Sequence, residues 1–148
     1  MKRIIILFFI FVLCISLSAC YDSEEAGTTE NAELDYGNSI LYSEAEIQSA
    51  FDAVLIKFED FRGCDLKRLW YDEEQSDKDI QRDISSSGSN TIKNSGAEPG
   101  NIMVLYSDWR TGESSDDGTP PDFDYFDFTW ILIRNSETDD WELTSWGY

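Results

Sequence analysis

The stretch YFDFTWILIR, residues 125–134, has the strongest β-strand signal in the chain. Aromatic and β-branched side chains dominate it, and both kinds favour the extended backbone of a strand. From Phe128 to Ile133 the residues on both faces are mostly apolar, which is typical of a strand that is covered on both sides. The sequence therefore predicts a central strand here, around which the rest of the fold is arranged.

Three further segments have strand character. The polar residues 135–140 form a loop of hairpin length, so the strand predicted over 141–148 should pair antiparallel with 125–134. Two earlier segments, 65–71 and 102–109, are also strand-like: the first combines Leu with Trp and Tyr, and the second is apolar on both faces near its start. The sequence thus predicts a curved antiparallel sheet of about four strands.

A helix is predicted ahead of these strands, from Ser43 to Gly63. Ser43 and Glu46 match the Ser-x-x-Glu capping box that begins many helices. Gly63 has the freedom to adopt the left-handed conformation that ends a helix. The apolar residues between them recur three and four positions apart, which places them on one buried face; they are Ile47, Ala50, Phe51, Val54, Leu55, Phe58 and Phe61. One long N-terminal helix packed on one sheet makes the predicted fold class α+β.

Two long polar segments interrupt the strands, at 72–101 and 110–124. Their content of Gly, Pro, Ser and Asp is typical of exposed loops. A short helical turn is predicted around 77–84, where Ile80 and Ile84 lie four residues apart. Long loops on a small scaffold often carry function, although mobility alone also explains such a composition.

Residues 4–17 are almost entirely apolar and follow Lys2 and Arg3. As a helix this run would be roughly 21 Å long, whereas the hydrocarbon core of a bilayer is about 30 Å thick. A basic start, a short apolar run and small residues at its end are the three parts of a secretory signal peptide. The sequence therefore predicts that residues 1–19 direct export and are then removed.

The apolar run ends in Leu17-Ser18-Ala19-Cys20, which resembles the lipobox of the bacterial lipoprotein family. The resemblance implies that the Cys20 thiol receives a diacylglyceryl group and that lipoprotein signal peptidase, recognising Leu17, Ser18 and Ala19, cuts before Cys20. Two acyl chains hold a protein on a membrane firmly, whereas one binds only marginally. The expected location is the extracytoplasmic face of the cell membrane, held by the lipid. The alternative is an ordinary signal peptide followed by a chance cysteine.

Beyond the lipobox the chain divides into a spacer and a domain. Residues 20–39 are acidic, polar and small, with too little apolar surface to offset the entropy of ordering. This composition predicts a flexible acidic tether. The remaining residues, 40–148, are enough for one hydrophobic core, so we expect a single α+β domain there.

The chain is strongly acidic, with 30 Asp and Glu residues against 11 Lys and Arg residues. Such a surface repels phosphate backbones and anionic head groups, so neither nucleic-acid binding nor electrostatic attachment to a membrane is expected. Membrane contact would then depend on the lipid anchor alone. The acidity otherwise indicates solubility at a cell surface, or attraction of cations and basic partners.

The sequence also limits metal and cysteine chemistry. There is no His, which excludes a His general base, a Cys–His pair and His-containing zinc sites. Cys14 lies in the predicted signal peptide and Cys20 in the lipobox, which leaves Cys64 as a lone thiol, expected to be a small core residue. The acidic loop 116–124 lacks the spacing of an EF-hand calcium loop. No metal and no cofactor are expected.

Four short segments carry a second resemblance: FRGCDL at 61–66, LWYDE at 69–73, VLYSD at 104–108 and WELTSWGY at 141–148. Together they resemble small lipoproteins of Gram-positive bacteria with a domain of the nuclear transport factor two-like superfamily, which is also called SnoaL-like or cystatin-like. The resemblance covers roughly residues 43–148. It implies a cone-like α+β fold in which the sheet curves around a central space.

Enzymes with this cone fold place a carboxylate or a Tyr inside the cone, where burial raises the pKa of a carboxylate and fits it for proton transfer. By this resemblance the candidate catalytic residues are Tyr71, Asp72 and Asp108. The candidate ligand-binding aromatic residues are Trp70, Tyr106 and Trp130. Our hypothesis is a membrane-anchored module that binds a small molecule or another surface protein. The alternative is an isomerase-like or cyclase-like enzyme.

Overall fold

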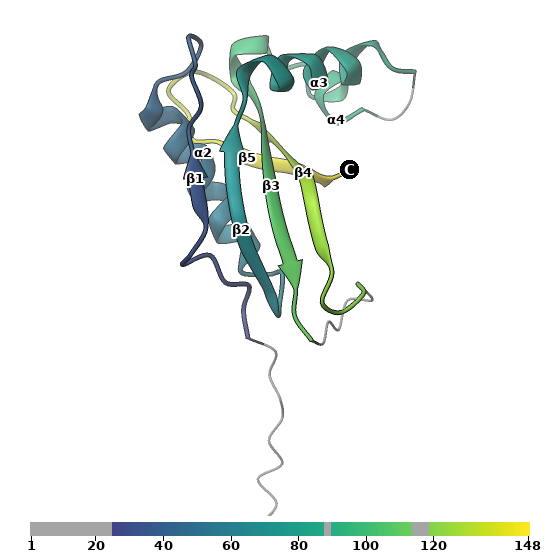
Figure 1. Ribbon diagram of the computed structural model, residues 1–148. Coiled ribbons are helices and arrows are strands. Elements are labelled where there is room, and N and C mark those ends of the chain that lie inside the picture. Colours follow the sequence, from purple (N-terminus) through teal and green to yellow (C-terminus); the bar gives the residue numbers. More distant parts are fainter. Residues whose placement is uncertain (1–24, 88–89, 114–118) are drawn as a thin grey trace, which may run out of the picture.

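The strand predicted at 125–134 is confirmed in the computed structural model, where it forms β4, Asp124–Ile133; it lies between β3 and the edge strand β5, and the central place of the sheet belongs to β3. The structure describes residues 25–87, 90–113 and 119–148. It is an α+β fold whose five strands make one mixed sheet in the order β1-β2-β3-β4-β5, with helices on both faces (Figure 1). The predicted signal peptide and lipobox lie outside the described residues. Within those described ranges no helix is long and apolar enough to cross a bilayer.

Three other strands also match the sequence-based prediction. They are β2, Cys64–Tyr71, β3, Ile102–Thr111, and β5, Glu142–Gly147, and the pairings β2–β3, β3–β4 and β4–β5 are all antiparallel. The hairpin predicted between β4 and β5 is confirmed, with Ile133 opposite Glu142. Alternation of side chains between the two faces of these strands decides which residues reach the core and which reach a binding site.

The fifth strand is a correction to the expected four. β1, Glu33–Asp35, pairs in parallel with β2, although the sequence predicts a flexible tether there. Its three residues are too few and too polar to signal a strand. Order comes from its neighbours: the carboxylate of Asp35 is 2.6 Å from the guanidinium of Arg68, and Leu34 and Tyr36 pack on the core. The sheet is therefore mixed, with one short parallel edge.

The predicted helix is confirmed as α2, Glu44–Phe58, with the Ser43–Glu46 capping box in place. It ends at Phe58, earlier than Gly63, because the chain tightens there into i→i+3 turns, in which the N–H of Phe61 donates to the carbonyl of Phe58 at 2.9 Å. The N–H of Gly27 donates to the carbonyl of Glu59 at 3.1 Å. A Cβ on Gly27 would lie 2.1 Å from the carbonyl oxygen of Phe58, so only glycine fits this contact.

The main hydrophobic core lies between α2 and one face of the sheet, and α2 is seen behind the sheet in Figure 1. The buried stripe of α2 packs there on side chains from β2, β3 and β4. Aromatic rings fill most of the space, and they include Phe51, Phe58, Trp109, Phe128 and Trp130. Cys64 is also buried in this core, as predicted for its thiol.

The largest departure from the sequence-based prediction is at 72–101, for which the sequence predicts a loop with one helical turn. This segment contains α3, Glu73–Ser85, α4, Thr91–Ser95, and a 3₁₀ turn, Pro99–Asn101. α3 is fixed by polar contacts that apolar periodicity does not detect. The buried hydroxyl of Ser76 accepts the N–H of Val104 on β3 at 3.1 Å, beyond the point where β2 ends.

A second, smaller core forms where α3 and α4 cover the opposite face of the sheet. Ile80 of α3 and Ile92 of α4 pack there on Ile102, Val104 and Tyr106 of β3. Met103 and Leu105 of the same strand point the other way, into the core under α2. β3 is thus buried on both faces, but α3 covers only the upper part of its face in Figure 1 and leaves the lower part open.

Candidate functional site

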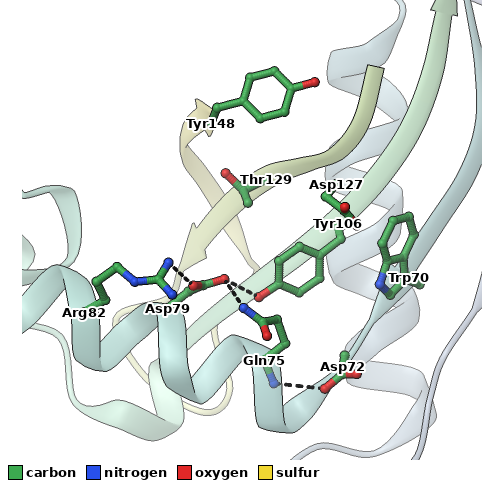
Figure 2. Close-up of a pocket in the computed structure, with 9 residues that line it drawn as sticks. All are labelled: Trp70, Asp72, Gln75, Asp79, Arg82, Tyr106, Asp127, Thr129 and Tyr148. Atoms are coloured by element: carbon green, nitrogen blue, oxygen red, sulfur yellow. Dashed lines mark hydrogen bonds and ion pairs between the residues drawn. The ribbon is translucent and has the colours of Figure 1, made fainter. Parts of the chain in front are cut away.

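A hollow of about 520 Å³ lies where α3 overhangs the open part of the sheet. Figure 2 shows its lining: Trp70, Asp72, Gln75, Asp79, Arg82, Tyr106, Asp127, Thr129 and Tyr148. A second hollow of about 320 Å³ adjoins it and shares Asp79, Arg82, Thr129 and Tyr148. We call the two hollows together the α3 groove. It runs between α3 on one side and strands β3 and β4 on the other.

The floor of the groove is aromatic. Trp70 on β2 and Tyr106 on β3 are paired in register, and their rings are stacked with centroids 5.9 Å apart and planes tilted by 30°. The guanidinium of Arg68 lies 4.8 Å from the centre of the Trp70 ring. Tyr148 stands at the far side of the groove with 81% of its surface exposed. The groove therefore offers aromatic surface to a ligand without rearrangement of the core.

Asp79 connects α3 to this floor. Its carboxylate accepts the Tyr106 hydroxyl at 2.8 Å, the Arg82 guanidinium at 2.6 Å and the Gln75 amide at 3.2 Å, as drawn in Figure 2. Burial, and then the hydrogen bond to Asp79, raises the pKa of Tyr106. The phenol therefore stays protonated at neutral pH and acts as a donor, and the Asp79 carboxylate is held in place.

A β-bulge brings Asp127 to the groove. Ser107 is opposite Phe128 and Trp109 is opposite Tyr125, so β4 has an extra residue between these two pairs. Asp127 sits in the bulge with a left-handed φ of 54°, a conformation that favours glycine, asparagine or aspartate. Its N–H donates to the Asp108 carboxylate at 3.0 Å. The carboxylate of Asp108, a predicted catalytic candidate, therefore supports this bulge.

Three of the residues predicted from sequence come together in the groove: Trp70, Tyr106 and Asp72. Asp72, proposed there as a catalytic candidate, is the N-cap of α3, where its carboxylate accepts the N–H of Gln75 at 2.9 Å. Such a capping bond satisfies a backbone donor that the helix leaves free. Its position is therefore explained by helix stability, although Asp72 also lines the groove.

Tyr71 and Trp130 belong to the core on the other face of the sheet, so the α3 groove does not include them, although Tyr71 contributes to a separate hollow with Trp70 and Asp72. Neighbouring residues of a strand point to opposite faces, and Tyr71 and Trp130 are both buried in the core under α2. Burial raises the pKa of Tyr71. The Trp130 indole N–H donates to the hydroxyl of Ser107 at 2.8 Å. Both are core residues without access to the groove.

Sequence reasoning missed the groove residues on α3. Asp72, Gln75, Asp79 and Arg82 are spaced three, four and three apart, which places their side chains on one face of a helix. This spacing becomes a signal once 73–85 is recognised as helical. Thr129, Asp127 and Tyr148 give no such signal, because a bulge and the twist of the sheet bring them to the same place.

In the described part of the chain, no group of three or more His, Cys, Asp or Glu side chains has the arrangement of a metal site. The first part of the acidic loop 116–124, residues 116–118, lies outside the described residues.

No protein-family model matches this chain, and neither does any curated protein or any solved structure. The two resemblances stated from the sequence therefore stay predictions. Function has to be argued from the groove itself.

Proposed function

We propose that this protein is a lipid-anchored extracytoplasmic binding module and that the α3 groove is its ligand site. The signal peptide and lipobox support export and anchoring of the chain at Cys20. The groove supports binding, because it combines exposed aromatic surface with a few polar groups held in fixed positions. The relation of α2 and β2–β5 to the cone-like family belongs to the same proposal.

The observation that favours binding over catalysis is the position of the groove outside a filled core. Among the described residues no Asp or Glu is buried, whereas proton transfer by a carboxylate usually depends on burial that raises its pKa. The carboxylates of Asp72 and Asp108 already accept backbone N–H groups. The space under α2, where a cone enzyme would place its chemistry, is occupied by aromatic rings.

The groove is tested by a fragment screen followed by NMR with the ¹⁵N-labelled full chain in a neutral detergent. We expect hits to shift the amide signals of Gln75, Tyr106 and Thr129. Trp70→Ala should weaken these hits by about tenfold, because stacked aromatic surface of this size contributes roughly 1–1.5 kcal/mol. Trp146→Ala is the matched control, because Trp146 is also partly exposed but lies on the other face of the sheet, where it contacts Lys57 of α2. Fragments that bind Trp70→Ala as tightly as they bind the parent would contradict the proposed site.

Anchoring is tested by replacing Cys20 with Ser. The variant should lose incorporation of a labelled fatty acid and should leave the membrane fraction, because no thiol remains to carry the two acyl chains. Cys14→Ser is the matched control, because it removes a thiol six residues earlier in the same apolar run. It should be labelled and fractionate as the parent does. A Cys20→Ser protein that is still labelled and membrane-bound would refute the lipid anchor.

A further inference from the structure

We infer that the α3 groove binds a protonated primary amine on an aliphatic chain, the chemistry shared by a lysine side chain and a linear polyamine. This inference rests on the proposed function and names the ligand class for the same site. Three features of the groove support it: its excess of carboxylates, its division into an acidic–aromatic and an apolar part, and the place that Arg82 occupies in it.

The first feature is charge. Asp72, Asp79 and Asp127 line the larger hollow and Asp83 lines the smaller one, whereas Arg82 is the only cationic side chain among the residues that line them. Within the described residues, no side-chain or backbone donor bonds to the Asp127 carboxylate. The Asp127 carboxylate is therefore open to a cationic ligand in the larger hollow, and an ammonium group there would be attracted by the carboxylates that line it.

The second feature is the change in lining along the groove. At one end the carboxylates stand beside the rings of Trp70 and Tyr106, and such ring faces attract cations. The Arg68 guanidinium over Trp70 shows that this ring already accepts a cation from the chain itself. At the other end Ile92, Val104 and Ile131 form an apolar wall. In a ligand with an ammonium group on a methylene chain, the ammonium group would contact the acidic and aromatic end and the methylene chain would contact the apolar wall.

The third feature is the ion pair between Arg82 and Asp79. The Arg82 nitrogen is 2.6 Å from the carboxylate, yet 74% of the Arg82 side chain is exposed while only 17% of the Asp79 side chain is. The Asp79 carboxylate is thus fixed by its hydrogen bonds to Tyr106 and Gln75, whereas the Arg82 side chain extends into solvent. We take the guanidinium to occupy the position of the ligand's ammonium group, so an arriving amine displaces Arg82 from Asp79.

The test is calorimetric titration of the full chain in neutral detergent with three probes. Spermidine and Nα-acetyl-lysine methylamide represent the two sources of the amine, and Nα-acetyl-norleucine methylamide is the uncharged control. We expect at least one amine to bind and the norleucine compound not to bind. Binding of spermidine alone identifies a free polyamine as the ligand, and binding of the lysine compound identifies a lysine side chain.

Three variants test the arrangement. Arg82→Ala should tighten binding of the amine by about fivefold, because the competing cation is gone, and Asp127→Asn should weaken it by about fivefold. Asp139→Asn removes the same charge from the β4–β5 loop and should leave the affinity unchanged. An Arg82→Ala protein that binds no more tightly, or an Asp139→Asn protein that binds as weakly as Asp127→Asn, would overturn the inference.

The outcomes also separate this inference from the proposed function. Uncharged or anionic fragments that bind at Gln75, Tyr106 and Thr129, with no binding of either amine, would overturn the amine ligand and leave the groove as a binding site. Absence of binding by every fragment and both amines would overturn both. Equal binding of the lysine and norleucine compounds would show that the charge is not recognised and would overturn the inference alone.

Discussion

Trp130→Ala is expected to lower the free energy of unfolding by about 4 kcal/mol, the range for removal of a large buried ring. Trp130 is fully buried in β4, which pairs with β3 on one side and β5 on the other. Its ring lies 5.2 Å from that of Phe128 and 5.4 Å from that of Phe61, measured between centroids. Its removal would also leave the buried Ser107 hydroxyl without the indole N–H. Urea denaturation of the full chain measures the change.

Trp146→Ala is the control for this prediction, because Trp146 is on the same face but 44% exposed. It should cost about 1 kcal/mol or less, since little of its apolar surface leaves water. Ligand binding gives a second readout: a correctly folded fraction of Trp130→Ala should keep its affinity for groove ligands. Loss of affinity at unchanged stability would mean that Trp130 belongs to the binding site after all.

Arg134→Ala should also destabilise the fold, by about 2–3 kcal/mol, because it removes a buried cation that donates hydrogen bonds to several acceptors at once. Arg134 is 5% exposed. Its guanidinium is 3.0 Å from the Glu46 carboxylate and donates to the carbonyl groups of Gly100 and Glu137. It also lies 4.4 Å from the centre of the Trp141 ring. One side chain thus joins the start of α2, the 3₁₀ turn and the β4–β5 loop.

Arg62→Ala is the matched control, because Arg62 is exposed and its replacement should change stability by less than about 0.5 kcal/mol. Thermal unfolding of both variants beside the parent gives the comparison. Arg134→Lys should recover little, since an ammonium group lacks the planar fork that reaches several acceptors at once. If Arg134→Ala were as stable as Arg62→Ala, the network around Arg134 would not hold these elements together.

The four antiparallel strands and α2 could be predicted because their own residues carry a local signal: α2 repeats its apolar residues three and four positions apart, and the strands combine aromatic and apolar residues over strand-length runs. Phe128 to Ile133 fixes a strand with two buried faces, and the structure gives the cause, since α2 covers one face of the sheet and α3 the other. The capping box at Ser43 fixed the start of α2 to the residue. In these elements the local sequence pattern and the tertiary packing favour the same secondary structure, so the sequence alone predicts them.

α3 and β1 could not be predicted, because their order depends on contacts with distant residues and not on a local sequence pattern. In α3 only Ser76 and Ile80 are buried, so a helix with one apolar anchor has no stripe to detect. Its stability comes from a cap at Asp72 and from the bond between Ser76 and Val104, a residue 28 positions away. β1 depends on backbone pairing with β2, whose edge no local sequence pattern reveals.

Of the candidate site, the aromatic floor could be predicted from the sequence, but the groove residues on α3 and β4 could not. The aromatic pair Trp70 and Tyr106 could be proposed because both lie in strong strands, and the same reasoning placed Tyr71 and Trp130 beside them. Residue type alone cannot separate the two groups, because the deciding fact is which face of the sheet each residue occupies. A bulge moves the side chains that follow it to the opposite face of the strand. The β2–β3, β3–β4 and β4–β5 pairs each contain a register shift of this kind.

The bulge at Asp127 has a further consequence for how the protein behaves beside its own copies. β5 ends at Gly147, opposite Thr129, so in the described residues no strand pairs with 124–128 on that side. A straight, uncharged stretch of unpaired backbone is a template on which chains polymerise. Here the left-handed residue interrupts the ladder of N–H and C=O groups and adds a negative charge. The open end of β4 is therefore a poor starting point for aggregation, even at high protein concentration.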